Sequence, residues 1–307
     1  MRKIRTDLAM ESFQASGRER MPGVKINRWE EMGIGVTEVI VDSEEAAGEL
    51  GKPKGAYLTL ECAALRRRDM EARLAMANLL GEELSRLVHP SDDAPVLVIG
   101  LGNRTITPDA LGPQAIDRVL VTRHMFREIP EYADRRMRSV CAIAPGVLGV
   151  TGIETVEMVE SLVKSIHPRA VLCIDSLAAR AADRICSTVQ ITDTGIQPGS
   201  GVGNHRRALT KEAVGVEVVS LGIPTVIYAA TLARDAMEML APDEERENDA
   251  AFNSFERELK QSELGDMIVT PREIDSLIAD AAEVIAAGVI RALQPELSDE
   301  EIMAMMD

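Results

Sequence analysis

The sequence predicts an α/β fold: a doubly wound, mostly parallel sheet with helices on both faces and an added smaller subregion. Two continuous apolar runs, 95–99 and 170–174, end in a glycine turn or a polar residue, which is typical of strands buried on both faces of a parallel sheet. Helical periodicity at 69–88, 153–166 and 271–293 alternates with such runs. This alternation predicts successive strand–helix–strand units.

The remaining patterns extend the alternation along the chain. Runs rich in β-branched or apolar residues predict further strands at 34–41, 57–60, 139–144, 189–192 and 216–221. Further helices are expected at 109–122 and 226–240, and a short acidic helix closes the chain. The first thirty residues are polar and lack periodicity, so we interpret them as an arm. Residues 242–266 are charged, and we interpret them as a polar insertion in a single α/β domain.

The chain is strongly acidic, with 34 Lys and Arg against 50 Asp and Glu and a formal net charge of −16. Such a charge repels phosphate backbones, which argues against direct binding of nucleic acid. The four cysteines form no CxxC pair, as is typical of thiols in a reducing cytoplasm. No apolar stretch has the length of a membrane span. We expect a cytoplasmic protein that binds neither membranes nor nucleic acid.

Two aspartates stand where a catalytic crevice is expected. Asp109 follows the 95–99 strand and its glycine turn, and Asp175 follows the 170–174 strand. In open α/β sheets, sites form outside the carboxyl ends of the strands, so both carboxylates are expected in one crevice. Two close carboxylates share a proton, which suits hydrolysis of a peptide bond. The alternatives are structural: Asp109 as a first-turn residue of a helix, and Asp175 as a cap.

Glycine-rich loops are expected to line the same crevice. Their candidate residues are Gly100, Gly102, Asn103, Gly199, Gly201 and Gly203. The chain contains no GxSxG, HExxH or GxxxxGK[ST] motif, so serine hydrolase, zinc protease and P-loop chemistry are disfavoured, and no cofactor is expected. A second hypothesis for the site is a metal held by Asp109, Asp175 and His205.

Several motifs, taken in order, resemble the germination protease family of spore-forming bacteria. They are RTDLA at 5–9, VIGLGN at 98–103, TPDALGP at 107–113, IDSLAAR at 174–180, QPGSGVGN at 197–204 and LGIPT at 221–225. The resemblance implies that Asp109 and Asp175 form the catalytic pair, without a metal, in a fold related to the hydrogenase-maturation proteases. It also implies a homotetramer in the forespore or spore core that cleaves small acid-soluble spore proteins.

The family further implies a zymogen that removes its own N-terminal segment. TDLAME at 6–11 has the order acid, bulky apolar, Ala, any residue, Glu, which resembles the sites that the family cuts. We expect a propeptide of residues 1–7, a protease domain of residues 8–307 and a scissile bond between Asp7 and Leu8. Two other hypotheses stay open: a metal-dependent maturation-type protease and a non-catalytic scaffold that binds spore proteins.

Overall fold

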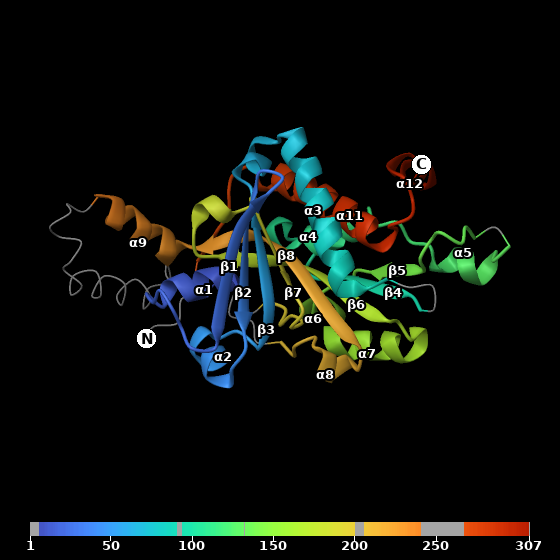
Figure 1. The fold of residues 1–307 in the computed structure, drawn as a ribbon, viewed down its shortest axis with the longest axis horizontal. Coiled ribbons are helices and arrows are strands. Elements are labelled where there is room, and N and C mark those ends of the chain that lie inside the picture. The colour runs from blue at the N-terminus through green and yellow to red at the C-terminus, as the bar shows by residue number, and fades with distance from the viewer. Residues whose placement is uncertain (1–5, 91–93, 132, 200–205, 241–266, 307) are drawn as a thin grey trace.

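The computed structural model describes the chain except residues 1–5, 91–93, 132, 200–205, 241–266 and 307, and it has the predicted α/β class (Figure 1). In the described part of the chain, nine strands form one sheet in the order β1-β2-β3-β7-β8-β6-β4-β5, with β9 paired to β8. The strands are β1 (Val24–Glu31), β2 (Ile34–Val41), β3 (Gly55–Glu61), β4 (Val96–Gly100), β5 (Val140–Ile143), β6 (Ala170–Ala179), β7 (Thr188–Thr192), β8 (Glu217–Tyr228) and β9 (Ile268–Val269).

The helices surround this sheet. The α-helices are α1 (Ala9–Ala15), α2 (Glu44–Leu50), α3 (Met70–Val88), α4 (Leu111–Ile116), α5 (Arg123–Glu128), α6 (Leu148–Thr151), α7 (Thr155–Ile166), α8 (Lys211–Val214), α9 (Ala229–Leu240), α11 (Ile274–Leu293) and α12 (Asp299–Met306). Short 3-10 turns are η1 (Ala63–Arg67), η2 (Thr107–Asp109) and η3 (Ala182–Arg184). None of the helices in the described ranges is long and apolar enough to cross a bilayer.

One half of the sheet, β5-β4-β6-β8, is parallel, as the continuous apolar runs predict. Alternate residues of these strands face two different cores. Leu172 and Ile174 pack with α3 and α11, whereas Val171 and Cys173 pack with α7 and α8 on the opposite face (Figure 1). The carboxyl ends of these strands, where the candidate aspartates lie, therefore stand on a rigid, two-sided core.

The other half, β1-β2-β3-β7, is antiparallel, and β7 and β9 also pair antiparallel with β8, so the sheet is mixed and not mostly parallel as predicted. β1 and β2 form a hairpin whose two turn residues, Met32 and Gly33, both have positive φ. Turns of this kind match the right-handed twist of paired strands. The antiparallel strands extend the sheet laterally, and β2 and β3 contact α1, which in turn contacts α2.

The structure corrects the interpretation of the first thirty residues as an arm. Residues 9–15 form α1, residues 24–31 form β1, and the side chains of Leu8 and Ala9 are fully buried. The sequence signal was weak because α1 is only two turns long and its apolar residues, including Met10 and Phe13, join a core made mostly by distant strands. The predicted insertion 242–266 lies outside the described residues.

Two strands near the site are also longer than their apolar runs predict. β6 continues through Asp175 to Ala179, and β8 continues beyond the predicted strand at 216–221 to Tyr228. The two strands pair with each other along this whole length, with a register shift between Leu177 and Ala178 opposite Pro224. A proline donates no backbone hydrogen bond, so it fits a β-bulge. The predicted helix at 109–122 is shorter, because α4 covers only residues 111–116.

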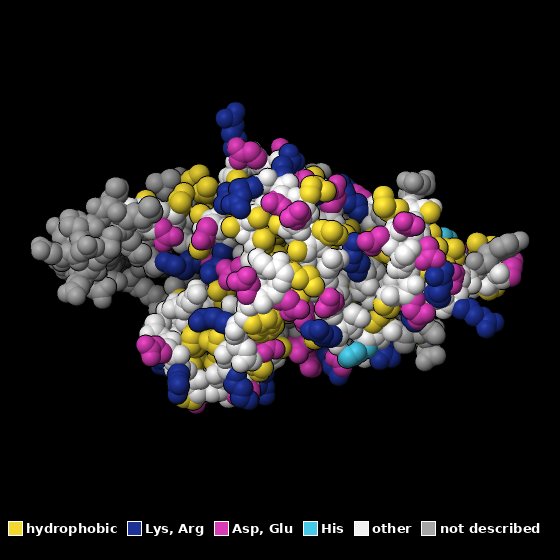
Figure 2. All heavy atoms as spheres, turned by 45° about the horizontal axis from the view of Figure 1, so that its top comes forward, with side chains coloured by type: hydrophobic (Ala, Val, Ile, Leu, Met, Phe, Trp, Pro, Cys, Tyr) yellow, Lys and Arg dark blue, Asp and Glu magenta, His cyan; other side chains and the backbone are white. Residues whose placement is uncertain are grey.

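Acidic and basic side chains alternate over the face drawn in Figure 2. Some of them form ion pairs between helices, such as Arg68 with Asp280 at 2.5 Å and Arg73 with Glu283, which join η1 and α3 to α11. The helices α3 and α11 cross closely, since a Cβ on Gly288 would lie 2.6 Å from Leu80 Cδ2. This pair of helices covers the face of the sheet opposite α7.

Candidate active site

Asp109 lies at the end of η2, in the loop that follows β4. Its carboxylate accepts a hydrogen bond from the backbone N–H of Asn103 at 2.8 Å. Gly102 has φ +114°, and any Cβ there would overlap the carbonyl oxygen of Asp109. The glycine therefore lets the loop close tightly upon itself. Burial raises the pKa of the Asp109 carboxyl above its ordinary value, although the Asn103 hydrogen bond opposes the shift.

Asp175 lies within β6, opposite Gly222 of β8, and only 5% of its surface is exposed. Its Oδ1 accepts a hydrogen bond from the N–H of Ser176 at 2.8 Å. Burial raises the pKa of the Asp175 carboxyl well above its ordinary value, and the negative charge of Asp109 raises it further. This buried group therefore favours its protonated form.

Asp109 and Asp175 both line one cavity of about 520 Å³. β4 and β6 are adjacent, and the chain that leaves β4 stays close to β6 because the N–H of Leu101 donates to the carbonyl oxygen of Ile174 at 2.8 Å. Gly112 permits this approach, since a Cβ there would lie 2.6 Å from the same Ile174 oxygen. The loop carrying Asp109 is thereby held beside Asp175.

The glycine-rich candidates divide into three groups. Gly102, Asn103 and Gly199 line the cavity. Gly100 does not line it but packs against α4, where a Cβ would overlap the carbonyl oxygen of Gly112. Gly201, Gly203 and His205 lie outside the described residues, so the proposed metal set of Asp109, Asp175 and His205 has only its two aspartates in the structure.

Asp7 also lines this cavity, next to Asp175. Its N–H donates to the carbonyl oxygen of Ala178 at 2.9 Å, and its Oδ2 accepts from the Ala178 N–H at 2.8 Å. These two hydrogen bonds attach the N-terminal segment to β6, the strand that carries Asp175. The charge of Asp7 is a further, smaller cause of the raised pKa of Asp175, after burial and Asp109.

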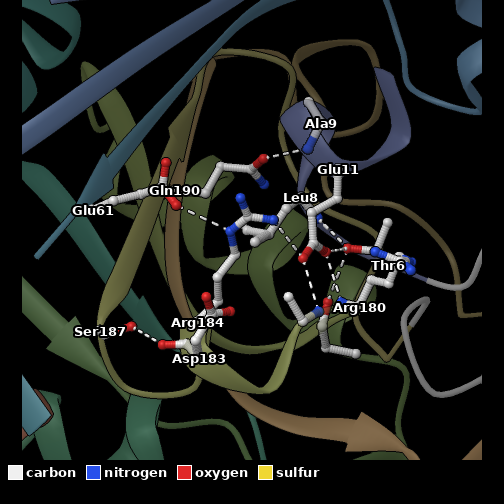
Figure 3. Close-up of polar contacts among 12 residues, drawn as sticks. Thr6, Leu8, Ala9, Glu11, Glu61, Arg180, Asp183, Arg184, Ser187 and Gln190 are labelled. Atoms are coloured by element: carbon white, nitrogen blue, oxygen red, sulfur yellow. Dashed lines mark hydrogen bonds and ion pairs between the residues drawn. The ribbon is translucent and has the colours of Figure 1, made fainter. Parts of the chain in front are cut away.

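The segment that follows Asp7 is anchored by Glu11, which is 2% exposed (Figure 3). Its carboxylate accepts from the backbone N–H groups of Arg180 and Ala181 at 2.7 and 3.0 Å, and from Arg184 Nη1 at 2.7 Å. The hydroxyl of Thr6 donates to the same carboxylate. A buried carboxylate with four donors is fully satisfied, so it holds the segment in one position.

A second, smaller cavity of about 190 Å³ shares Asp7 and Asp175 with the larger one. Lys52 and Gln190 line it, and both contact the carbonyl oxygen of Asp7. Neither residue, nor the Glu11–Arg184 pair, was identified from the sequence. Glu11 could have been found from the sequence, since it is the last residue of the TDLAME pattern. Lys52 and Gln190 belong to no sequence motif and are recognisable only from the fold.

A buried carboxyl group, Asp175, and a half-buried one, Asp109, line one cavity with raised pKa values, and such a pair has a specific chemical use. Two adjacent carboxyls titrate as a unit and hold one proton between them over a range of pH. In that state one can accept a proton from water while the other donates one to a leaving group. The cavity is therefore equipped for hydrolysis.

The comparison with known proteins identifies the family of this chain. A model of the germination protease family matches residues 4–265. The chain belongs to the germination protease family. Germination proteases of Caldanaerobacter subterraneus subsp. tengcongensis and Clostridium perfringens are each 39% identical to it, covering 99% and 98% of this chain and 98% of each relative. The germination protease of Bacillus mycoides is 36% identical over 97% of this chain and 95% of the relative.

Membership in the germination protease family shows a peptidase, a hydrolase of peptide bonds that acts in spore germination. The matched range 4–265 contains Asp109, Asp175 and the segment around Asp7 and Leu8. The resemblance inferred from the motifs is therefore confirmed at the level of the family.

Proposed function

We propose that this chain is an aspartic-type endopeptidase that begins the degradation of small acid-soluble spore proteins during germination. One observation carries the proposal: Asp109 and Asp175 line a single cavity, and both have pKa values raised by burial. Charge repulsion between them favours the state with one shared proton. That state supplies a base and an acid to the same water molecule and peptide bond.

In this mechanism, the ionised carboxyl takes a proton from water as the water oxygen attacks the peptide carbonyl carbon. The protonated carboxyl then donates to the departing nitrogen, and the pair returns with one proton. Asp175 is the better proton holder of the two because it is more deeply buried and its pKa is shifted further. Because the two carboxyl groups titrate as a coupled pair, the roles of acid and base exchange between Asp109 and Asp175 during the catalytic cycle.

The proposal includes synthesis as a self-processing zymogen, with residues 1–7 as the propeptide and a cut between Asp7 and Leu8. The position of Asp7 supports the proposed cut, because Asp7 lines the cavity of Asp109 and Asp175 instead of extending into solvent. Acid is expected to promote the cut by restoring the singly protonated pair.

Further parts of the proposal follow from the resemblance and the composition. They are a homotetrameric assembly, a cytoplasmic location in the forespore or spore core, and a doubly wound fold related to the hydrogenase-maturation proteases. A net charge of −16 supports a substrate that is protein and not nucleic acid.

The test replaces each carboxyl by an amide. Asp109→Asn and Asp175→Asn are each expected to fold and to lose cleavage of an acid-soluble spore protein, because either the base or the acid is then missing. Asp42→Asn, an exposed aspartate on the β1–β2 hairpin side that pairs with Lys25, is the matched control and should keep full activity. A non-catalytic scaffold would bind the spore protein equally well in all of these variants and cut it in none. Near-normal cleavage by a folded Asp109 or Asp175 variant would refute the two-aspartate mechanism.

A further inference from the structure

The carbonyl oxygen of Asp7 is the acceptor for two side chains that come from different parts of the fold. Lys52 Nζ donates to it at 2.8 Å, and Gln190 Nε2 donates to it at 3.0 Å. Two donors, one of them charged, on a single peptide carbonyl form an arrangement that stabilises negative charge on that oxygen. Asp7 O belongs to the bond between Asp7 and Leu8.

Gln190 forms hydrogen bonds to the backbone on both sides of the Asp7–Leu8 bond. Its Oε1 accepts from the backbone N–H of Ala9 at 2.7 Å while its Nε2 donates to the Asp7 oxygen, and the contact to Ala9 is drawn in Figure 3. A backbone N–H is only a donor and a carbonyl only an acceptor, so these two contacts determine the orientation of the amide. The side chain therefore binds the segment as a neighbouring strand would, across Leu8.

The sheet register places Gln190 on the same side as Asp175. Gln190 of β7 pairs with Gly222 of β8, and Gly222 pairs with Asp175 of β6. Residues paired across adjacent strands project their side chains to the same face. The residue between them is a glycine, so no side chain separates the glutamine from the aspartate. The smaller cavity accordingly contains Asp7, Gln190 and Asp175 together.

Lys52 is positioned by the end of α2. Gly51 has φ +66°, and the N–H of Lys52 then donates to the carbonyl oxygen of Ala47 at 3.1 Å, a turn that ends the helix. The Lys52 ammonium also donates to the carbonyl oxygen of Thr6 at 3.1 Å. Burial lowers the pKa of Lys52, and the charges of Asp7 and Glu11 oppose that shift. A partly desolvated cation acts more strongly on a carbonyl than a solvated one does.

We propose that Lys52 and Gln190 are catalytic residues that bind the developing oxyanion when this site cuts its own Asp7–Leu8 bond. The inference rests on the proposed function, since it names the groups that complement the Asp109–Asp175 pair. Lys54, which lies two positions away and pairs on the surface with Glu44, has no such role.

Water attacks the Asp7 carbonyl carbon and gives one proton to the ionised carboxyl of the pair, and the carbonyl electrons move to the oxygen held by Lys52 and Gln190. The carbonyl then re-forms, the C–N bond breaks, and the nitrogen of Leu8 takes a proton from the pair. The products are a carboxyl group on Asp7 and an amino group on Leu8, and the pair again holds one proton.

The test measures the rate of self-cleavage by intact mass in the full-length chain. Lys52→Met and Gln190→Glu are each expected to slow the cut by about 100-fold, the usual loss when one oxyanion donor is removed. Gln190→Glu retains an oxygen to accept from Ala9 N–H but lacks the N–H that donates to Asp7, so it separates oxyanion binding from docking of the segment. Lys54→Met is the control for lysine, and Gln14→Glu, an exposed glutamine on α1, is the control for glutamine; both should cut at the normal rate.

Docking is measured separately, as protection of the Ala9 amide from hydrogen exchange, with Asp175→Asn added so that the bond stays intact. Slow cutting with Ala9 still protected supports the proposal. Rates within about threefold of the unaltered chain for both variants overturn it. Lost protection in Gln190→Glu also counts against it, because the side chain would then serve only to dock the segment. Should Asp175→Asn alone still cut, the proposed function fails, whatever the result for Lys52 and Gln190.

Discussion

Asp7 and Ala178 form a reciprocal pair of hydrogen bonds, in which the Ala178 carbonyl accepts from the Asp7 backbone and the Ala178 N–H donates to the Asp7 carboxylate. Ala178 lies on the same strand as Asp175, so this pair brings a third carboxylate to the two of the larger cavity. The electrostatics of the site therefore depend on whether residues 1–7 are attached.

Removal of residues 1–7 is expected to lower the pKa of Asp175. Burial and Asp109 are the larger causes of its raised pKa, but Asp7 adds negative charge, and its loss also admits water. Carboxyl ¹³C titration of the full-length chain and of a chain that begins at Leu8, both carrying Asp109→Asn to prevent cutting, would measure the change. Equal pKa values in the two samples would contradict this account.

The stability of the protein should depend on pH through Asp175. Its folded pKa lies above the ordinary value of 3.8, so the folded state keeps a proton that the unfolded state releases. This contribution to stability is complete below 3.8 and is lost as pH rises through the folded pKa. Asp175→Asn stays neutral and can still accept from Ser176 N–H. In denaturant unfolding, the free energy of unfolding of Asp175→Asn relative to that of the unaltered protein should increase as pH rises. Asp42→Asn should show no such trend.

Gly102→Ala is expected to destabilise the protein by about 2 kcal/mol or more and to displace Asp109. The reason is that φ is +114° and the added Cβ would overlap the Asp109 carbonyl oxygen. Gly33→Ala is the control, since Gly33 has φ +74° with open space around it and should cost only about 1 kcal/mol. Denaturant unfolding measures the first effect and cleavage rate the second. A fully active Gly102→Ala variant would show that the loop is not needed to hold the carboxyl.

Glu11→Ala is expected to lower the free energy of unfolding by about 2–3 kcal/mol, because it leaves the part-buried N–H groups of Arg180 and Ala181 without their acceptor. Arg184 keeps Glu61 as a partner at 3.0 Å, which limits the loss. Glu49→Ala removes a more exposed ion pair with Arg18 and should change stability by no more than about 1 kcal/mol. Equal effects of the two substitutions in denaturant unfolding would mean that the Glu11 anchor contributes little.

Exhaustive EDTA treatment is expected to leave peptidase activity unchanged. A divalent ion held by Asp109 and Asp175 would require both carboxyls ionised, whereas burial raises the pKa of each and favours a shared proton. Activity that is lost with EDTA and returns in proportion to added Zn²⁺ or Ni²⁺ would instead favour the metal-dependent hypothesis with His205.

Local patterns were sufficient to predict the elements beneath the site. The apolar runs at 95–99 and 170–174 gave correct strands, because a strand covered on both faces needs apolar residues at consecutive positions. Placing Asp109 and Asp175 after those strands needed only the rule that sites form at the carboxyl ends of parallel strands. The lengths of β6 and β8 were not predicted, because polar and proline residues enter them where cross-strand pairing outweighs local propensity.

The sequence by itself determined the α/β class, the parallel half of the sheet, the family and the positions of the two aspartates, since each depends on residues close together in the chain. Only the tertiary structure decided that the N-terminal segment is buried and that Lys52 and Gln190 meet at the carbonyl of Asp7. Those contacts join positions far apart in sequence, and no periodic pattern of residues predicts them. They arise because packing of α1, α2 and β7 around one cavity satisfies polar groups that none of these elements could satisfy alone.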